Sequence, residues 1–168
     1  MFELLHMASF AFPRVALYFE NSILKPDLPL LSAAAATVTH YRKDRQGVSV
    51  TSPADLELLW SGGATVDGKE WPLVASGAVL LPAGMHMVQT APLRAGISIA
   101  DLNATLISAS ANGRKAAFRY SSGSRAIVRF DRKPAAMILD ERALAVECVE
   151  GSNCTVLLPA GEHSVTVR

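Results

Sequence analysis

Short runs of alternating apolar and polar residues dominate the second half of the chain. Each run has five or six residues, and segments rich in Gly, Pro, Asn, Asp and Ser separate the runs. Short runs with turn residues at this regular spacing predict the strands of a β-sandwich or barrel. The six predicted strands are Lys115–Tyr120, Arg125–Phe130, Ala135–Leu139, Ala143–Cys148, Cys154–Leu158 and Glu162–Val167.

The first half repeats this pattern less regularly. Its predicted strands are Val15–Phe19, Ala36–Arg42, Gly47–Thr51, Leu56–Trp60, Ala64–Val66, Ala78–Leu81 and Met85–Gln89. Lys43–Gly47 reads as a hairpin loop. Helix signals are weak: Leu28–Thr39 predicts one or two turns, and Asp101–Ala104 a further short turn. The chain is therefore expected to be all-β.

An internal repeat organises these strands. The pattern L-L-P-A-G-x-H-x-V occurs at Leu80–Val88 and again at Leu157–Val165, with seven identities in nine positions. Weaker matches precede both copies, and both copies read as the turn of a β-hairpin. Because a repeat of this length indicates a repeated structural unit, we predict two tandem sandwich modules, residues 1–91 and 92–168. Whether they form two sandwiches or one merged sheet system stays open.

Charge and hydropathy exclude two classes of partner. The net charge is +1, and Arg42, Lys43 and Arg45 are the densest basic group, which is too small for a nucleic-acid-binding field. Trp71–Leu93 has no formal charge, but its three prolines and two glycines would interrupt a membrane-spanning helix. We therefore predict neither a nucleic-acid nor a membrane partner.

The uncharged segment has a consequence for packing. Where the second copy carries Glu162, the first copy carries Met85, followed by Met87 on the same strand face. A strand that is apolar on both faces is usually covered on both. Met85 and Met87 are thus a candidate interface with the other module or with a partner.

The repeated histidines invite a metal or catalytic interpretation. Alternation places His163 on the apolar face with Val165 and Val167, which favours an imidazole at the edge of the core, bonded to a nearby backbone group. His86 occupies the matching position. No zinc-type spacing of Cys and His is present, so we predict no metal and no cofactor.

Cys148 and Cys154 flank a five-residue segment that reads as a hairpin loop. Facing cysteines could form a disulfide, which would indicate an oxidising compartment, but such a short loop gains little from closure. The sequence is therefore compatible both with a Cys148–Cys154 disulfide and with two free thiols. The N-terminus lacks a basic region and a cleavage site, so we expect a cytoplasmic chain or a piece of a longer exported protein.

Catalytic motifs are not evident. The nucleophile-elbow, dinucleotide and phosphate-loop patterns are absent, and a carboxylate pair such as Glu20 with Asp27 is a remote option for a glycosidase. The aromatic residues offer a different chemistry, because they could stack against sugars, although they are more often core residues. The candidates for ligand binding are Trp60, Trp71 and Tyr120, with Trp71 expected to be the most exposed.

The C-terminal pattern resembles a known architecture. Pro134, Ile138-Leu139-Asp140 and the run Thr155–Val167 are similar to the closing β-sandwich of many bacterial glycoside-hydrolase-like proteins, which often end in v-x-L-P-x-G-x-H-x-v-x-v. The likeness covers roughly residues 97–168 and, less closely, 47–90. It implies two immunoglobulin-like modules, with roughly the first 30 residues leading from an upstream catalytic domain.

The resemblance implies a function but supplies no catalytic residue. We expect a non-catalytic accessory region of a larger exported bacterial protein, extracellular or periplasmic, that braces a catalytic domain or contacts polysaccharide. The alternative is a structural or adhesive module that binds another protein. A self-contained hydrolase is the least favoured interpretation. Because one fold serves many functions, the link to sugars is an analogy.

Overall fold

The computed structural model describes residues 38–75, 77–148 and 154–168, which form sixteen strands and no helix. The all-β prediction is confirmed for this part of the chain. The strands make two five-stranded and two three-stranded sheets, all with antiparallel pairing. The predicted strand Val15–Phe19, the predicted helical turns up to residue 37 and the predicted linker lie outside the described residues.

The first eight strands form the larger sheet β1-β2-β8-β4-β5 and the smaller sheet β3-β7-β6. Their bounds are β1 His40–Lys43, β2 Val48–Ser52, β3 Leu56–Leu59, β4 Gly63–Val66, β5 Lys69–Glu70, β6 Val74–Ala75, β7 Ala78–Leu81 and β8 Gly84–Ala91.

The other eight strands form the larger sheet β10-β11-β16-β13-β14 and the smaller sheet β15-β12-β9. Their bounds are β9 Ile99–Leu102, β10 Thr105–Asn112, β11 Lys115–Ser122, β12 Ala126–Phe130, β13 Met137–Leu139, β14 Arg142–Leu144, β15 Cys154–Leu158 and β16 Gly161–Val167.

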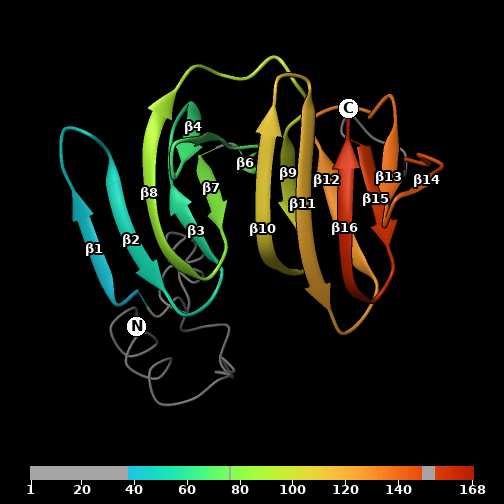
Figure 1. Ribbon diagram of the computed structural model, residues 1–168, viewed down its shortest axis with the longest axis horizontal. Helices are drawn as coiled ribbons and strands as arrows, with labels where there is room; N and C mark the ends of the chain where they lie inside the picture. Colours follow the sequence, from blue (N-terminus) through green and yellow to red (C-terminus); the bar gives the residue numbers. More distant parts are fainter. Residues whose placement is uncertain (1–37, 76, 149–153) are drawn as a thin grey trace, which may run out of the picture.

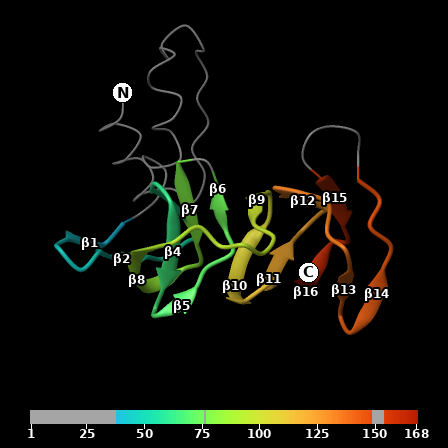
Figure 2. The ribbon, with the colours of Figure 1, turned by 90° about the horizontal axis from the view of Figure 1, so that it is seen from above.

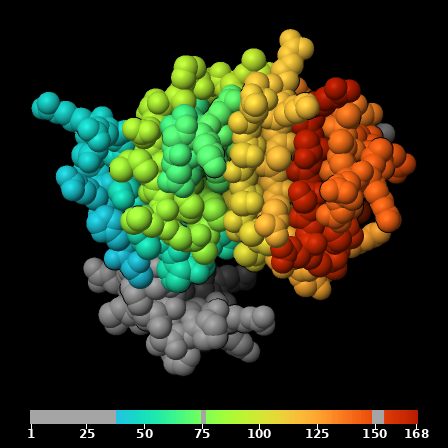
Figure 3. Space-filling model, in the orientation of Figure 1, coloured from blue at the N-terminus to red at the C-terminus, as the bar shows by residue number. Residues whose placement is uncertain are grey.

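The four sheets lie in two layers (Figures 1 and 2). The two larger sheets share one layer, where β5 lies beside β10, and the two smaller sheets share the other, where β6 lies beside β9. Figure 3 shows the strands of both larger sheets side by side across one face of the molecule. The architecture is sandwich-like, and the layers run through both halves.

The chain changes layer at the repeated motif. Leu81 ends β7 in a smaller sheet, and Gly84 begins β8 in a larger one; Leu158 and Gly161 do the same between β15 and β16. The expectation of a hairpin at this motif is therefore wrong, because β7 pairs with β3 and β15 pairs with β12. The Pro-Ala turn connects the two layers of the sandwich.

The core lies between the layers and is continuous from one half to the other. Alternation along the strands builds it: Val48 and Val50 on β2, like Val128 and Phe130 on β12, are buried while their neighbours are not. Burial of these side chains removes apolar surface from water, which is the main stabilising contribution to such a fold.

Local corrections concern strand ends. The predicted strand Ala143–Cys148 is wrong beyond Leu144, because the chain then leaves its sheet to cross to the other layer. Asp101–Ala104 is not helical; its first two residues end β9. The predicted loop Lys43–Gly47 is confirmed as the connection of β1 to β2.

Candidate functional site

A cavity of about 390 Å³ opens at one end of the first half. The β1–β2 loop forms one wall, and the segment between β3 and β4 contributes Trp60. Amide, hydroxyl, carboxylate and cationic side chains line the cavity together with the indole. The lining residues are Lys43, Asp44, Arg45, Gln46, Gly47, Val48, Trp60, Thr65, Gln89 and Thr90.

Asp44 shapes the loop wall of this cavity. Its Oδ1 accepts hydrogen bonds from the backbone N–H of Gln46, at 2.8 Å, and of Gly47, at 3.2 Å. Such bonds are a standard way for Asp to stabilise a turn. Its Oδ2 lies 3.8 Å from Nε of Arg42. The carboxylate is therefore engaged within the loop.

Lys43 and Arg45 remain as the cations of the cavity. Both are exposed, and the ion pairs found among the described residues include neither. Exposed cations flanking a tryptophan favour a ligand with negative charge. In the sequence these residues belong to the densest basic group, but they are remote from Trp60. The fold brings all three residues to one cavity.

Trp60 is held in place at the cavity wall. It is half-buried, its Nε1 donates to the carbonyl of Gly63 at 3.2 Å, and its backbone N–H donates to the carbonyl of Gly77 at 2.9 Å. A fixed indole loses little conformational entropy when a ligand stacks on it. Gln46 and Gln89 can donate and accept hydrogen bonds beside it.

The other two aromatic candidates lie in the core. Trp71 is 5% exposed and its Nε1 donates to the carbonyl of Leu80, so the expectation that it is the most exposed aromatic is wrong. Tyr120 is fully buried, with its hydroxyl donating to the carbonyl of Pro159 at 2.8 Å. Buried Trp and Tyr usually find such partners, and neither ring offers a face to solvent here.

The methionines of β8 differ in exposure. Met85 is 73% exposed, whereas Met87 is half-buried. The expectation that the other half of the chain covers this strand face is therefore wrong for Met85. Contact with a separate partner stays a prediction.

Each repeated histidine contacts an aspartate in the turn of a neighbouring hairpin. His86 Nδ1 lies 2.8 Å from Asp67 Oδ2, and His163 Nδ1 lies 2.6 Å from Asp140 Oδ2. The other carboxylate oxygen accepts the backbone N–H of the residue after the histidine. These contacts tie the outer hairpin of each larger sheet to the strand that follows the layer change.

The contact between His163 and Asp140 shifts the pKa values of both side chains. Hydrogen bonds from His163 Nδ1 to Asp140 and from Nε2 to the Ala160 carbonyl, 2.9 Å away, raise the pKa of His163. The hydrogen bond from the Ser164 backbone and that from His163 lower the pKa of Asp140. Both ring nitrogens face acceptors, which favours the imidazolium. The expected backbone partner of His163 is confirmed.

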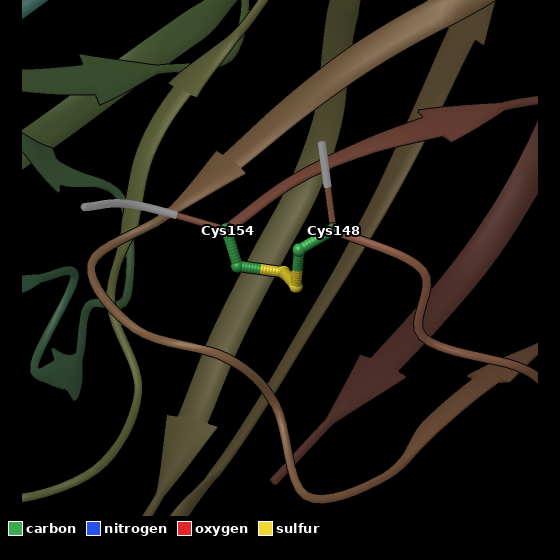
Figure 4. Close-up of a disulfide and its surroundings, with 2 residues drawn as sticks. All are labelled: Cys148 and Cys154. Carbon is green, nitrogen blue, oxygen red and sulfur yellow. A yellow bond between two sulfur atoms is a disulfide. The ribbon is translucent and has the colours of Figure 1, made fainter. Parts of the chain in front are cut away.

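A disulfide joins Cys148 to Cys154 (Figure 4). Cys154 begins β15 and is buried, whereas Cys148 follows β14 and is half-buried. The bond therefore links the chain leaving a larger sheet to the first residue of a smaller one. It does not span a hairpin, because β14 and β15 belong to different sheets.

Other chemistry is sparse in the described part of the chain. No group of three or more metal-ligating side chains is found there, and no helix there is long and apolar enough to cross a membrane. Glu20 and Asp27 lie outside the described residues. The cavity at Trp60 combines an aromatic ring with amide, hydroxyl and cationic side chains.

Comparison with known proteins adds no identity. No protein-family model, no curated protein and no solved structure matches this chain.

Proposed function

We propose that this chain is a non-catalytic accessory region that contacts polysaccharide through the cavity at Trp60. The carrying observation is a half-buried, hydrogen-bonded indole that lines a polar cavity of about 390 Å³. Saccharides present both apolar ring faces and hydroxyl groups, so they suit an aromatic platform surrounded by amides. Loops on a rigid β scaffold commonly hold binding residues of this kind.

The charge of the cavity narrows the ligand class. Lys43 and Arg45 are cations, and the Asp44 carboxylate is already bonded to its own loop. An acidic saccharide, with carboxylate or sulfate groups, would gain two attractive partners where a neutral one gains only hydrogen bonds. The proposed ligand is therefore an acidic polysaccharide.

The organisation that we propose is a tandem pair of immunoglobulin-like modules derived from one repeated unit. The matching strand order of the two larger sheets and the matching contacts of His86 and His163 support it. The disulfide supports an oxidising compartment, extracellular or periplasmic. The place that we propose beside the catalytic domain of a larger bacterial protein rests on the resemblance of the C-terminal pattern alone.

Affinity electrophoresis against neutral and acidic polysaccharides tests the binding proposal. We expect retardation by acidic polysaccharides, and Trp60→Ala should weaken binding by about thirtyfold, because truncating an aromatic anchor at a hot spot costs about 2 kcal/mol. Trp60→Phe, which keeps a ring, should retain part of the binding. The double variant Lys43→Gln with Arg45→Gln should lose the preference for acidic chains.

Lys69→Gln is the matched control, because Lys69 is exposed on β5 and does not line the cavity. It removes a positive charge without changing the site and should bind normally. Folded protein that ignores every polysaccharide, or binding that survives Trp60→Ala unchanged, contradicts the proposal.

A protein-contact role is the second candidate, favoured by exposed apolar side chains. Met85 is 73% exposed, and Ile127 and Leu157, which face each other on β12 and β15, are 41% and 50% exposed. Such side chains could brace a neighbouring domain. Loss of cross-linking to the parent protein's upstream domain in a Met85→Lys variant would favour this role.

A further inference from the structure

The two halves meet at an edge that buries apolar side chains from both. Trp71 and Leu73 follow β5 in the first half, and Ile99 lies on β9 of the second; each is at most 5% exposed. The backbone N–H of Ile99 donates to the carbonyl of Pro72 at 2.9 Å, which joins β9 to the segment between β5 and β6. This contact is part of the continuous core.

A buried arginine closes the same junction. Arg94 lies between the halves, its side chain is 5% exposed, and its Nη2 donates to the carbonyls of Gly113 and Lys115. Its Nε is 3.8 Å from Glu70 on β5. Both layers of the first half thus end against the first strands of the second.

At its far edge the larger sheet of the second half ends in the same strand order as the larger sheet of the first half, and no third unit of described residues lies beside it. There β14 takes the place that β5 has in the first half. The smaller sheets end differently, because β6 is the edge strand at the junction whereas β15 is the edge strand at the far end. Between β14 and β15 opens a cavity of about 580 Å³. It is lined by Arg125, Leu144, Ala145, Glu147, Cys148, Val156 and Leu157.

Side chains at this far edge are more exposed than those that follow β5 at the junction. Ala145 and Leu157 are exposed, and Leu144 and Val146 are half-buried. Trp71 and Leu73, which follow the corresponding strand of the first half, are buried. The far edge is therefore an apolar surface similar to the one that the first half buries against the second half at the junction.

The opposite end of the molecule carries the complementary strand. β1 lies next to β2 as β10 lies next to β11, and β10 is the strand that meets the first half. All four residues of β1, His40–Lys43, are exposed, and Tyr41 is 55% exposed. β1 is basic, and the far cavity is lined by one anion, Glu147, and one cation, Arg125.

We propose that the cavity beside β14 and β15 receives the β1 edge of a second copy of this chain. The contact would continue, between molecules, the packing that joins the two halves within one molecule. It is heterologous, because the two surfaces lie at opposite ends, so it adds copies in a row and closes no symmetric dimer. This proposal rests on the correspondence of the halves and not on polysaccharide binding.

Sedimentation of the whole chain over a range of concentrations tests it. We expect the average mass to rise with concentration. A cavity variant, Ala145→Arg with Leu157→Lys, and an edge variant, Tyr41→Lys, should each stay monomeric when alone. Because each keeps the surface that the other has lost, an equal mixture of the two should form one-to-one dimers and nothing larger.

Met85→Lys is the control, since Met85 is exposed on β8 away from both ends. It should associate like the natural sequence. The proposal is overturned if the natural chain stays monomeric at hundreds of micromolar, if the mixture stays monomeric, or if Met85→Lys alone abolishes association. Circular dichroism of each variant checks that it is folded, and binding of a monomeric variant to polysaccharide separates this result from the proposed function.

Discussion

The imidazole of His163 has a hydrogen-bond acceptor at each ring nitrogen. Asp140 and the Ala160 carbonyl occupy those positions, and the N–H of Ser164 donates to the same aspartate. Gly161 makes the arrangement possible: its φ is +113°, and a Cβ there would lie 3.1 Å from His163 Nε2. The repeated G-x-H motif is thus explained by local packing.

The raised pKa of His163 predicts a pH-dependent contribution to stability. Because folding raises the pKa of His163, the imidazolium stabilises the folded protein fully at pH values below its ordinary pKa of 6.5. This stabilisation is lost as the pH rises through the pKa that His163 has in the folded protein. Because folding lowers the pKa of Asp140, its carboxylate stabilises the folded protein at pH values above its ordinary pKa of 3.8, and this stabilisation is lost as the pH falls. The contact should therefore contribute most between about pH 4 and 6.5.

Urea unfolding of the natural chain and of His163→Gln checks this. The difference in free energy of unfolding should be larger at pH 5.5 than at pH 9. His40→Gln, on exposed β1, removes an imidazole elsewhere and serves as the control. An equal difference at both pH values would mean that the charged imidazole contributes nothing.

At the scale of elements, the hairpins β4–β5 and β13–β14 have two-residue turns with positive φ at both positions. The turns are Asp67-Gly68 and Asp140-Glu141, with φ of 52° and 75°, and of 46° and 68°. This geometry is the type I′ turn, which matches the twist of the strands and prefers Gly at its second position. Glu141 is therefore the less suitable residue.

Exchanging the second turn residues tests this difference. Glu141→Gly should stabilise the protein by about 0.5–1 kcal/mol, because glycine adopts the left-handed conformation without steric strain. The greater conformational entropy of glycine in the unfolded chain offsets part of this gain. Gly68→Glu should destabilise it by a similar amount. Chemical denaturation measures both, and a stabilising effect of Gly68→Glu would contradict this account of the turns.

The disulfide acts on the connection between two elements. Its sulfur atoms join residues six apart, so reduction should cost about 2 kcal/mol by the loop-closure relation. Guanidinium unfolding with and without dithiothreitol measures this. The double variant Cys148→Ala with Cys154→Ala should not respond to the reductant, and a natural chain that is equally insensitive would show that the bond adds no stability.

The sequence predicts most strands but not their partners. Alternation locates β15 at its bounds, Cys154–Leu158, because its buried residues follow a strict period of two. β10 carries Thr105–Asn112 with small and polar side chains and escapes detection. β5, β6 and β9 are short and also escape. Layer changes are invisible to periodicity, which is why the repeated motif resembles a hairpin.

The same limit applies to the candidate site. Trp60 was predicted as a ligand-binding candidate, but so were two buried aromatics. Burial of Trp71 and Tyr120 leaves no polar hydrogen unpaired, because distant carbonyls of Leu80 and Pro159 accept them. Only the pairing of β2, β8 and β4 brings Gln89 and the loop cations to Trp60.

At the scale of the whole molecule, the core runs through both halves without interruption. Two domains with separate cores can unfold separately, whereas a shared core couples them. We therefore predict one cooperative thermal transition, with the calorimetric enthalpy equal to the van't Hoff enthalpy. Two resolved transitions, or a calorimetric enthalpy well above the van't Hoff value, would mean that the halves unfold independently.

The proposed function requires a saccharide to bind at Trp60. The chain has two tryptophans, so its nitrogen–proton NMR spectrum contains two indole signals, assigned with a Trp60→Phe variant. On titration with an acidic oligosaccharide, we predict that the Trp60 signal shifts to saturation. The signal of Trp71, buried and bonded to the Leu80 carbonyl, should stay in place. A Trp60 signal that does not move while other resonances saturate would contradict the account.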